Sequence, residues 1–189
     1  MAVVFGGPMC SRACARFGEG FCLHWTKVMT TLVRASDLLR ADHRQIEMLI
    51  DRLLTAVKHP NQRMVPEVRD AFDEIQKLMA SHFQKEEDCF YPYLRGTLGD
   101  SLTQMEEQHG YIKEVTEGVF ELTEGAGDGL DQRQCEELVR LSRELFNVIQ
   151  HHIVDEENQL FRLADLHLSA LEQDRLAATM AGLGVGPGC

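Results

Sequence analysis

The chain has 189 residues with 30 acidic and 19 basic side chains, which gives a formal net charge of -11. This balance argues against general binding to nucleic acid or to an anionic membrane, because both need a dense positive surface. A hydrophobic fraction of 44% is sufficient for a buried core, and no apolar run approaches the roughly 18 residues of a membrane span. We therefore expect a cytoplasmic protein without a membrane or nucleic-acid partner.

The N-terminal segment, residues 1–28, shows no helical or strand period and lacks the basic start and apolar block of a secretory signal. We expect this segment to be disordered. Three cysteines and a histidine lie in it: Cys10, Cys14, Cys22 and His24. Their spacing matches no zinc or iron–sulfur pattern. Met29 opens the stretch that becomes helical, so the sequence leaves open the role of these cysteines and a natural start at Met29.

Four long helical patterns follow, each with apolar residues every three or four positions. Their predicted starts are Ser36, the residue after Pro66, Ser101 and Asp131. The third and fourth starts are each followed three positions later by a glutamine, which is the sequence pattern of a capping box. The predicted ends of the first three helices are near His59, between Pro92 and Gly96, and at the glycine-rich run from Glu124.

A short fifth helix is predicted from Ser169, with Glu172 completing its cap, to Gly182, and a flexible tail follows. These patterns divide the chain into three parts: a disordered segment (1–28), a helical domain (29–168) and a short helix with its tail (169–189). Short breaks between long amphipathic helices are typical of antiparallel neighbours. The sequence therefore predicts an all-α fold, an antiparallel up-down-up-down four-helix bundle with a short C-terminal fifth helix.

One histidine interrupts the apolar seam of each long helix. These four residues are His43, His82, His109 and His152. Glu86 and Glu156 each follow a seam histidine by four positions, so each glutamate shares a helix face with that histidine. An unpaired carboxylate in a core costs several kcal/mol of folding free energy or takes up a proton. Two carboxylates among four imidazoles therefore indicate bound cations, and these donors suit iron, manganese or zinc.

The same set of residues occurs twice along the chain. The segment HFQKEEDCFYPYL from His82 parallels HIVDEENQLFRLA from His152, and ADHRQIE around His43 parallels EQHGYIKE around His109. A hydrogen bond usually explains a single core histidine, but it does not explain an ordered repeat of six polar seam residues. The repeat predicts a pseudo-two-fold site with one ion in each half. The predicted ligands are His43, His82, Glu86, His109, His152 and Glu156.

This ordered pattern, a histidine, an HxxxE pair, a second histidine and a second HxxxE pair, resembles the hemerythrin HHE cation-binding domain over roughly residues 34–168. The resemblance implies two iron ions bridged by carboxylates and by an oxo or hydroxo group, with manganese or zinc as alternatives. It also implies a small ligand, O2, NO or a peroxide, which the centre binds or senses, or a role in handling iron.

Two positions depart from the oxygen-carrying proteins of this type. Those proteins have a further histidine where this chain has Lys113, and its loss argues against simple reversible O2 carriage. They also place the acid of the fourth helix five positions after its histidine, which would make His151 the partner of Glu156. The internal repeat favours His152 instead. The sequence leaves open whether Lys113, His151 or Glu47 reaches the ions.

Other acids and tyrosines near the pattern are assigned to supporting positions. We expect Glu87, Asp155 and Glu157 to be solvated or to orient the ligand histidines. The tyrosines assigned to packing are Tyr91, Tyr93 and Tyr111.

Alternative functions are a di-metal oxidase or peroxide-consuming enzyme, and an iron–sulfur-repair enzyme. A ferritin-type oxidase would need more glutamates than histidines in its core. The sequence does not decide whether the protein is an enzyme, and it names neither protein partners nor the oligomeric state.

Overall fold

The computed structural model describes residues 32–58, 64–126 and 129–183, which belong to one compact unit, Leu32–Cys189. This described part is all-helical and contains no strand. Its helices are α1 (Ala35–Lys58), α2 (Met64–Lys85), η1 (Glu86–Phe90), α3 (Tyr91–Glu124), α4 (Gln132–Asp155), η2 (Glu156–Phe161), α5 (Arg162–His167) and α6 (Ala170–Leu183). Within these ranges no helix has both the length and the apolar character to cross a membrane. The N-terminal segment 1–28 and the last six residues of the tail lie outside the described ranges.

The predicted caps of α4 and α6 are confirmed. The Asp131 carboxylate accepts a hydrogen bond from the Gln134 amide at 2.8 Å, and the Gln134 side chain accepts one from the Asp131 amide at 2.9 Å. At the start of α6 the Ser169 hydroxyl accepts from the Glu172 amide at 3.3 Å, while the Ser169 amide donates to the Glu172 carboxylate at 2.8 Å. These bonds satisfy amide groups that have no partner inside the helix.

The predicted N-cap role of Ser36 is wrong. Helix α1 already begins at Ala35, and the buried Ser36 hydroxyl donates to the Asp165 carboxylate at 2.7 Å. This bond fixes the start of α1 against α5. Helix α2 begins at Met64, so Pro66 lies in its first turn as expected, where the missing amide N–H costs no intrahelical hydrogen bond.

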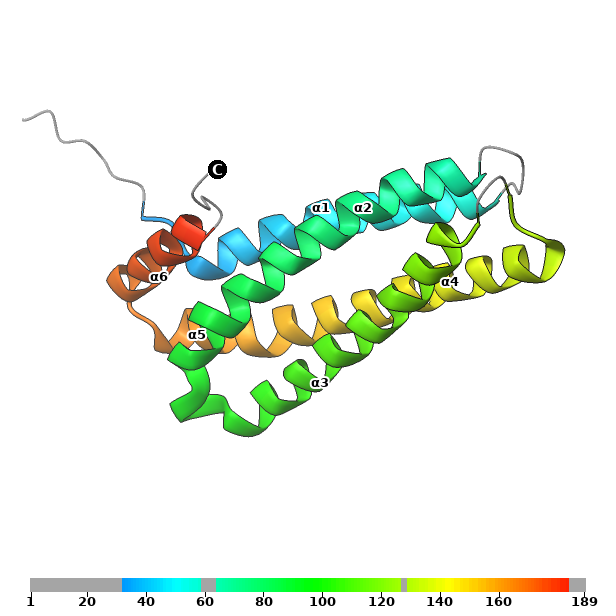
Figure 1. Cartoon of the computed structure of the whole chain (residues 1–189). Coiled ribbons are helices and arrows are strands. Elements are labelled where there is room, and N and C mark those ends of the chain that lie inside the picture. Colours follow the sequence, from blue (N-terminus) through cyan, green and yellow to red (C-terminus); the bar gives the residue numbers. More distant parts are fainter. Residues whose placement is uncertain (1–31, 59–63, 127–128, 184–189) are drawn as a thin grey trace, which may run out of the picture. The chain divides into compact units, whose positions relative to one another are not determined.

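The second and third predicted helices are continuous in the structure, which corrects the break expected between them. Ser101 lies inside α3, so its predicted role as an N-cap is wrong. The run of α2, η1 and α3 cannot be straight, because Glu87 Oε1 lies 2.8 Å from His109 Nδ1, whereas 22 residues of straight helix span about 33 Å. The ribbon turns back in the first part of α3 (Figure 1), which contains Pro92 and Gly96, two residue types found at helix kinks.

Two short π-helical segments, η1 and η2, interrupt the α-helices at equivalent points of the repeat. Each begins at a predicted glutamate, Glu86 or Glu156, and such π segments often occur at functional sites. Tyr91 and Phe161, each nine residues after a seam histidine, are fully buried. Nine residues of regular α-helix make about two and a half turns and would place these rings opposite the histidine. The π segments therefore change which side chains face the interior.

The four long helices pack as neighbours, α1 against α2 and α4, and α3 against α2 and α4 (Figure 1). Between α1 and α2, Asp42 pairs with Lys85 and Arg52 with Glu74, so residue numbers rise along one helix as they fall along the other. Arg69 of α2 pairs with Glu124 of α3, and Glu87 of η1 pairs with Lys113 of α3. Helix α6 packs against α1, where the side chain of Gln173 accepts a hydrogen bond from the first amide of α1 at 3.0 Å.

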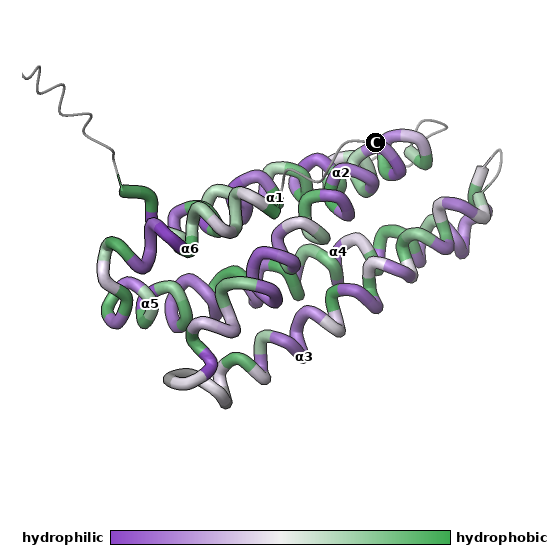
Figure 2. The backbone as a smooth tube through the Cα atoms, turned by 60° about the vertical axis from the view of Figure 1, so that its left-hand side comes forward, coloured by the Kyte–Doolittle hydropathy of each residue, from purple (hydrophilic) through white to green (hydrophobic). Residues whose placement is uncertain are grey.

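Apolar side chains form two clusters, and each seam histidine lies between them in the sequence of its helix. The first cluster includes Ile46, Met79, Ile112 and Ile149, and the second includes Leu39, Phe90, Met105 and Leu160. Figure 2 shows hydrophobic and hydrophilic residues alternating along every long helix, as expected for helices with one buried face. The polar residues between the clusters are thus kept from water. In this buried layer their electrostatic interactions are stronger than they would be at the surface.

Candidate metal centre

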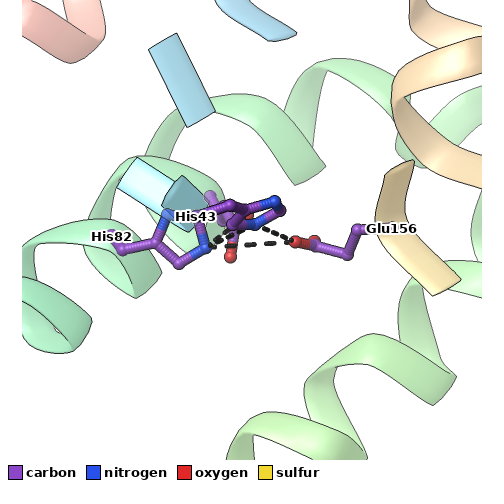
Figure 3. A group of neighbouring side chains, drawn as sticks. His43, His82 and Glu156 are labelled. Carbon is purple, nitrogen blue, oxygen red and sulfur yellow. Dashed lines mark hydrogen bonds and ion pairs between the residues drawn. The ribbon is translucent and has the colours of Figure 1, made fainter. Parts of the chain in front are cut away.

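All six predicted residues lie in one buried layer between the two apolar clusters. The four histidines are 1% exposed and the two glutamates 0% exposed. Their ligand atoms form two overlapping groups, and the atoms of each group lie within 4.8 Å of one another. The first half contains His43 and His82, the second half contains His109 and His152, and both include Glu86 and Glu156. Figure 3 shows the two imidazoles of the first half turned toward the Glu156 carboxylate.

Glu86 offers one carboxylate oxygen to each half. Its Oε1 lies 3.2 Å from His82 Nε2, and its Oε2 lies 3.2 Å from His109 Nε2. Because η1 begins at Glu86, this carboxylate is held at the point where the helix widens. The Glu86 carboxylate is therefore placed where it could bridge two ions.

Glu156 is turned so that one oxygen faces both halves. Its Oε2 lies 3.2 Å from His43 Nε2 and 3.5 Å from His152 Nε2. The other oxygen, Oε1, accepts a hydrogen bond from the Tyr91 hydroxyl. Both glutamates therefore lie between the halves, and loss of either one removes a donor from each half.

Acceptors outside the centre fix the orientation of the imidazoles. The Nδ1 contacts are His43 to Glu157 at 3.0 Å, His109 to Glu87 at 2.8 Å and His152 to the side-chain oxygen of Gln108 at 2.9 Å. Because these oxygens only accept, each Nδ1 atom donates its proton to the bond and each Nε2 atom presents a lone pair to the centre. His82 Nδ1 faces Asp42 at 3.5 Å. Of the acids expected to orient histidines, Glu87 and Glu157 make such contacts directly, while Asp155 binds Gln108 at 2.8 Å.

The donor atoms converge without partners that would neutralise them. Nε2 of His43 lies 3.2 Å from Nε2 of His82, and the same distance separates the two Nε2 atoms of the second half. Two facing lone pairs repel unless a proton or a cation lies between them. Glu86 Oε1 and Glu156 Oε2 also have no hydrogen-bond partner, which is rare for buried oxygens. These residues fit bound cations, because cations satisfy both the nitrogen and the oxygen atoms.

Burial shifts the pKa values of the centre. Burial lowers the pKa of His152 to about 3 and also lowers the pKa values of His82 and His109, so these imidazoles are neutral at neutral pH. Burial raises the pKa of Glu86 well above its ordinary value of 4.5, and the nearby Glu156 carboxylate raises it further. Burial alone would raise the pKa of Glu156 too, but the neighbouring imidazoles, His152 first among them, lower it.

The metal-free protein is expected to be most stable near pH 6.5, because the lowered pKa values of His82, His109 and His152 make stability rise up to this pH, and the raised pKa values of His43 and Glu86 make it fall above it. The stability that Glu86 contributes is complete below its ordinary pKa of 4.5 and is lost as pH rises, because its folded-state pKa is raised. The stability that neutral His152 contributes is complete above the ordinary 6.5 and is lost as pH falls toward 3. Urea unfolding across this range measures the effect. Glu86→Gln should reduce the loss at high pH, leaving the part that comes from the raised pKa of His43, and a stability that keeps rising to pH 8 would contradict the assignment.

The three residues left open by the sequence lie outside the two groups of ligand atoms. Glu47 is half-buried and accepts a hydrogen bond from a glutamine of α4 at 3.2 Å. Lys113 has a 57% exposed side chain, and its Nζ lies 3.1 Å from Glu87. The His151 side chain is 72% exposed, whereas His152 is buried in the centre. The spacing taken from the internal repeat therefore identifies the inward-facing histidine of α4.

Tyr91 lies in the centre, although the sequence pattern assigned it only to packing. Its hydroxyl donates to Glu156 Oε1 at 2.6 Å and lies 3.2 Å from His109 Nε2. Burial, together with the neighbouring carboxylates, raises the pKa of Tyr91 far above its ordinary value, so the phenol keeps its proton. The ring stacks on His109 at 5.6 Å, and at the equivalent position of the repeat Phe161 stacks on His43 at 5.3 Å. The hydroxyl group therefore makes the two halves different.

Tyr91→Phe is expected to destabilise the metal-free protein by about 1–3 kcal/mol, because the buried Glu156 carboxylate then loses its donor. The free energy of unfolding in urea measures this change. Tyr93→Phe is the matched control, since that hydroxyl is at the surface and bonds to Glu172 at 3.1 Å. The control should change stability by less than about 0.5 kcal/mol. Equal effects of the two substitutions would show that the Tyr91 hydrogen bond is not part of the centre.

A comparison with known proteins finds a distant relative that is longer than this chain. A curated protein named DNA nickase, from Nostoc sp. (strain PCC 7120 / SAG 25.82 / UTEX 2576), is 23% identical over 142 residues. The similarity covers 75% of this chain and 36% of that protein, so this chain spans little more than a third of the relative's length. The activity in the name belongs to the longer protein.

A family model, the Hemerythrin HHE cation binding domain, matches residues 34–164. The matched range extends from just before α1 into α5 and includes all six residues that line the centre. It also includes Tyr91 and the outer partners of the histidines. The match covers well over half of the chain, and its range contains both copies of the sequence repeat. The chain therefore belongs to the hemerythrin HHE cation-binding domain family.

Proposed function

We propose that this chain is a non-haem di-iron protein of the hemerythrin-like type. Its role is to bind or sense O2, NO or a peroxide, or to handle iron, in the cytoplasm. The iron ions lie inside an antiparallel, up-down-up-down bundle of α1, α2, α3 and α4. The opposite residue order of the cross-helix pairs supports this arrangement, and the family match supports a cation site.

One observation carries the proposal, the convergence of buried lone pairs. Each half has two Nε2 atoms 3.2 Å apart, and two carboxylates lie between the halves with oxygens that have no hydrogen-bond partner. Without a cation these groups would repel one another at a cost of several kcal/mol or would have to take up protons. Nitrogen and oxygen donors together suit iron, manganese or zinc.

The donor set leaves room for a small ligand. Four imidazole nitrogens, the two oxygens of Glu86 and the Oε2 of Glu156, which faces both halves, would fill about eight of the roughly twelve positions around two six-coordinate ions. Bound iron would supply redox chemistry and a Lewis acid. The chain itself holds the imidazoles in one tautomer, keeps water out with two apolar clusters, and places the Tyr91 hydroxyl as a hydrogen-bond donor to Glu156.

An oxidase or peroxide-consuming enzyme is the alternative, since the same centre could turn over its ligand. A ferritin-type oxidase has less support, because the centre contains four histidines and only two glutamates. Iron–sulfur repair depends on an additional partner or domain that these residues do not identify. The activity named for the Nostoc relative is not transferred, since the similarity covers 36% of that protein and this chain has a net charge of -11.

The test is the metal content and visible absorption of protein purified from cells, with and without O2. We expect about two iron ions per chain and absorption in the near ultraviolet and visible in the oxidised form. Protein that holds only zinc would be colourless and would contradict a redox or gas-binding role. Protein that binds no metal at all, even when iron, manganese or zinc is added to the folded chain, would indicate a helical interaction module instead.

A further inference from the structure

A groove of about 410 Å³ opens between α2 and α3 on the surface of the described unit. Its lining is mostly apolar and includes Ile75, Met79, Phe83, Ile112 and Phe120, with Lys113 at its edge. Most of these apolar side chains also belong to the first core cluster, so buried core residues form the floor of the groove.

The inner wall of the groove is the ring of Phe83, which lies directly against the candidate centre. Its centroid is 3.8 Å from that of His109, 6.0 Å from that of His82 and 6.1 Å from that of His152. On the groove side, the Lys113 Nζ lies 5.3 Å from the same ring centroid. One 4% exposed aromatic ring therefore separates the groove from three of the four histidines.

Other sides of the centre are covered by polar groups or by the second apolar cluster, and the amide of Gln108, hydrogen-bonded to His152, separates the centre from a recess between α3 and α4. Glu157 and Glu87 lie outside two of the histidines, and Tyr91, Phe161 and the second apolar cluster close the end toward α6. A small uncharged molecule partitions favourably into an apolar recess, and it crosses one ring more readily than a packed cluster.

We propose that the groove between α2 and α3 is the route by which small uncharged diatomic molecules reach the centre, and that Phe83 is its gate. The inference rests on the proposed function, since it concerns access to that site. Rotation of the Phe83 ring away from His109 opens the route toward the second half, on which the Tyr91 hydroxyl also lies. Lys113, whose amine is paired with Glu87, and Glu117 are the charged residues of the lining, and the side chains around Phe83 are otherwise mostly apolar.

The experiment compares NO association rates of the reduced, iron-loaded full chain by stopped-flow. Ala80→Trp fills the groove from an exposed position that lines it, without touching a ligand histidine. We expect about tenfold slower association, equivalent to about 1.4 kcal/mol of barrier, with unchanged iron content. Ala178→Trp, the same change at an exposed position of α6, should leave the rate unchanged. Phe83→Leu, which keeps an apolar side chain but thins the gate, should increase the rate.

An unchanged rate in Ala80→Trp with full iron content overturns the route while leaving the metal site intact. If the reduced wild type takes up no NO at all, the proposed gas-binding function fails instead. Xenon then still tests the route, because 129Xe NMR reports occupancy of an apolar recess without any reaction at the centre. Xenon binding by the wild type that disappears in Ala80→Trp supports the inference, and absence of xenon binding by the wild type overturns it.

Discussion

Glu156→Ala is expected to remove both ions rather than one. Glu156 Oε2 lies 3.2 Å from His43 Nε2 and 3.5 Å from His152 Nε2, so the substitution deletes a donor from each half. Metal bound only to the folded state adds about 4 kcal/mol of stability when its free concentration is a thousandfold above Kd. The variant should lose that increment, so its melting temperature should no longer respond to added metal. Elemental analysis and thermal unfolding with and without iron measure the two effects.

Three controls separate a bridging role from a general loss of folding. Glu156→Gln keeps the volume of the side chain and should still fold, as judged by circular dichroism, while binding little metal. Glu157→Ala removes an acid that contacts only His43 Nδ1, and should weaken binding by about 10–100-fold without abolishing it. Glu47→Ala alters a half-buried acid outside the centre and should retain both ions. Full metal content in Glu156→Ala, or equal losses in all variants, would contradict the bridging assignment.

The helices and the six inward-facing residues could be predicted because both depend on one regular period. Apolar residues every three or four positions define a buried face, and a histidine in that face is visible as an exception. The step of four between His82 and Glu86, and between His152 and Glu156, lies within regular helix, so the inference from spacing holds up to the glutamates. The same spacing distinguished His152 from His151, which lies on the exposed side of α4.

Tyr91 could not be predicted, because regular α-helix places it opposite His82. The π segment between them breaks the period, and nothing in residue type alone marks where a helix widens. The repeat offered the available signal: both copies have an aromatic residue at the ninth position after the histidine, Tyr91 or Phe161. Tyr93 and Tyr111 were also assigned to packing, but both are about half exposed, at 49% and 45%.

The outer partners of the histidines follow the repeat in part. Glu87 and Glu157 occupy equivalent positions and bind equivalent histidines. Asp42 and Gln108 are also equivalent, each preceding the histidine of its own helix, but one is a carboxylate and the other an amide. Sequence spacing identifies such positions only after the direction of each histidine ring is known, since the contact crosses from one helix to another.

The reduced, iron-loaded protein is expected to oxidise within minutes in air and not to recover when O2 is removed. The two halves have the same direct donors, two imidazoles and two shared carboxylates. An ion in either half would therefore keep the same number of open coordination positions. Lys113 does not change this balance, because its amine binds Glu87 and is separated from the centre by the Phe83 ring. Without one saturated ion and one open ion, both ions remain accessible to oxidation.

The measurement is the visible spectrum after anaerobic reduction, after addition of air, and after the O2 is removed again. Lys113→His is the informative variant, because a histidine at this position lies behind Phe83 and should leave the oxidation rate unchanged. The double substitution Phe83→Ala with Lys113→His removes that barrier, so oxidation that is slower in the double variant than in Phe83→Ala alone would indicate that the new imidazole reaches an ion. A spectrum that forms in air and reverts fully on deoxygenation of the wild type would contradict this prediction, because it would mean that a symmetric donor set is sufficient for reversible O2 binding.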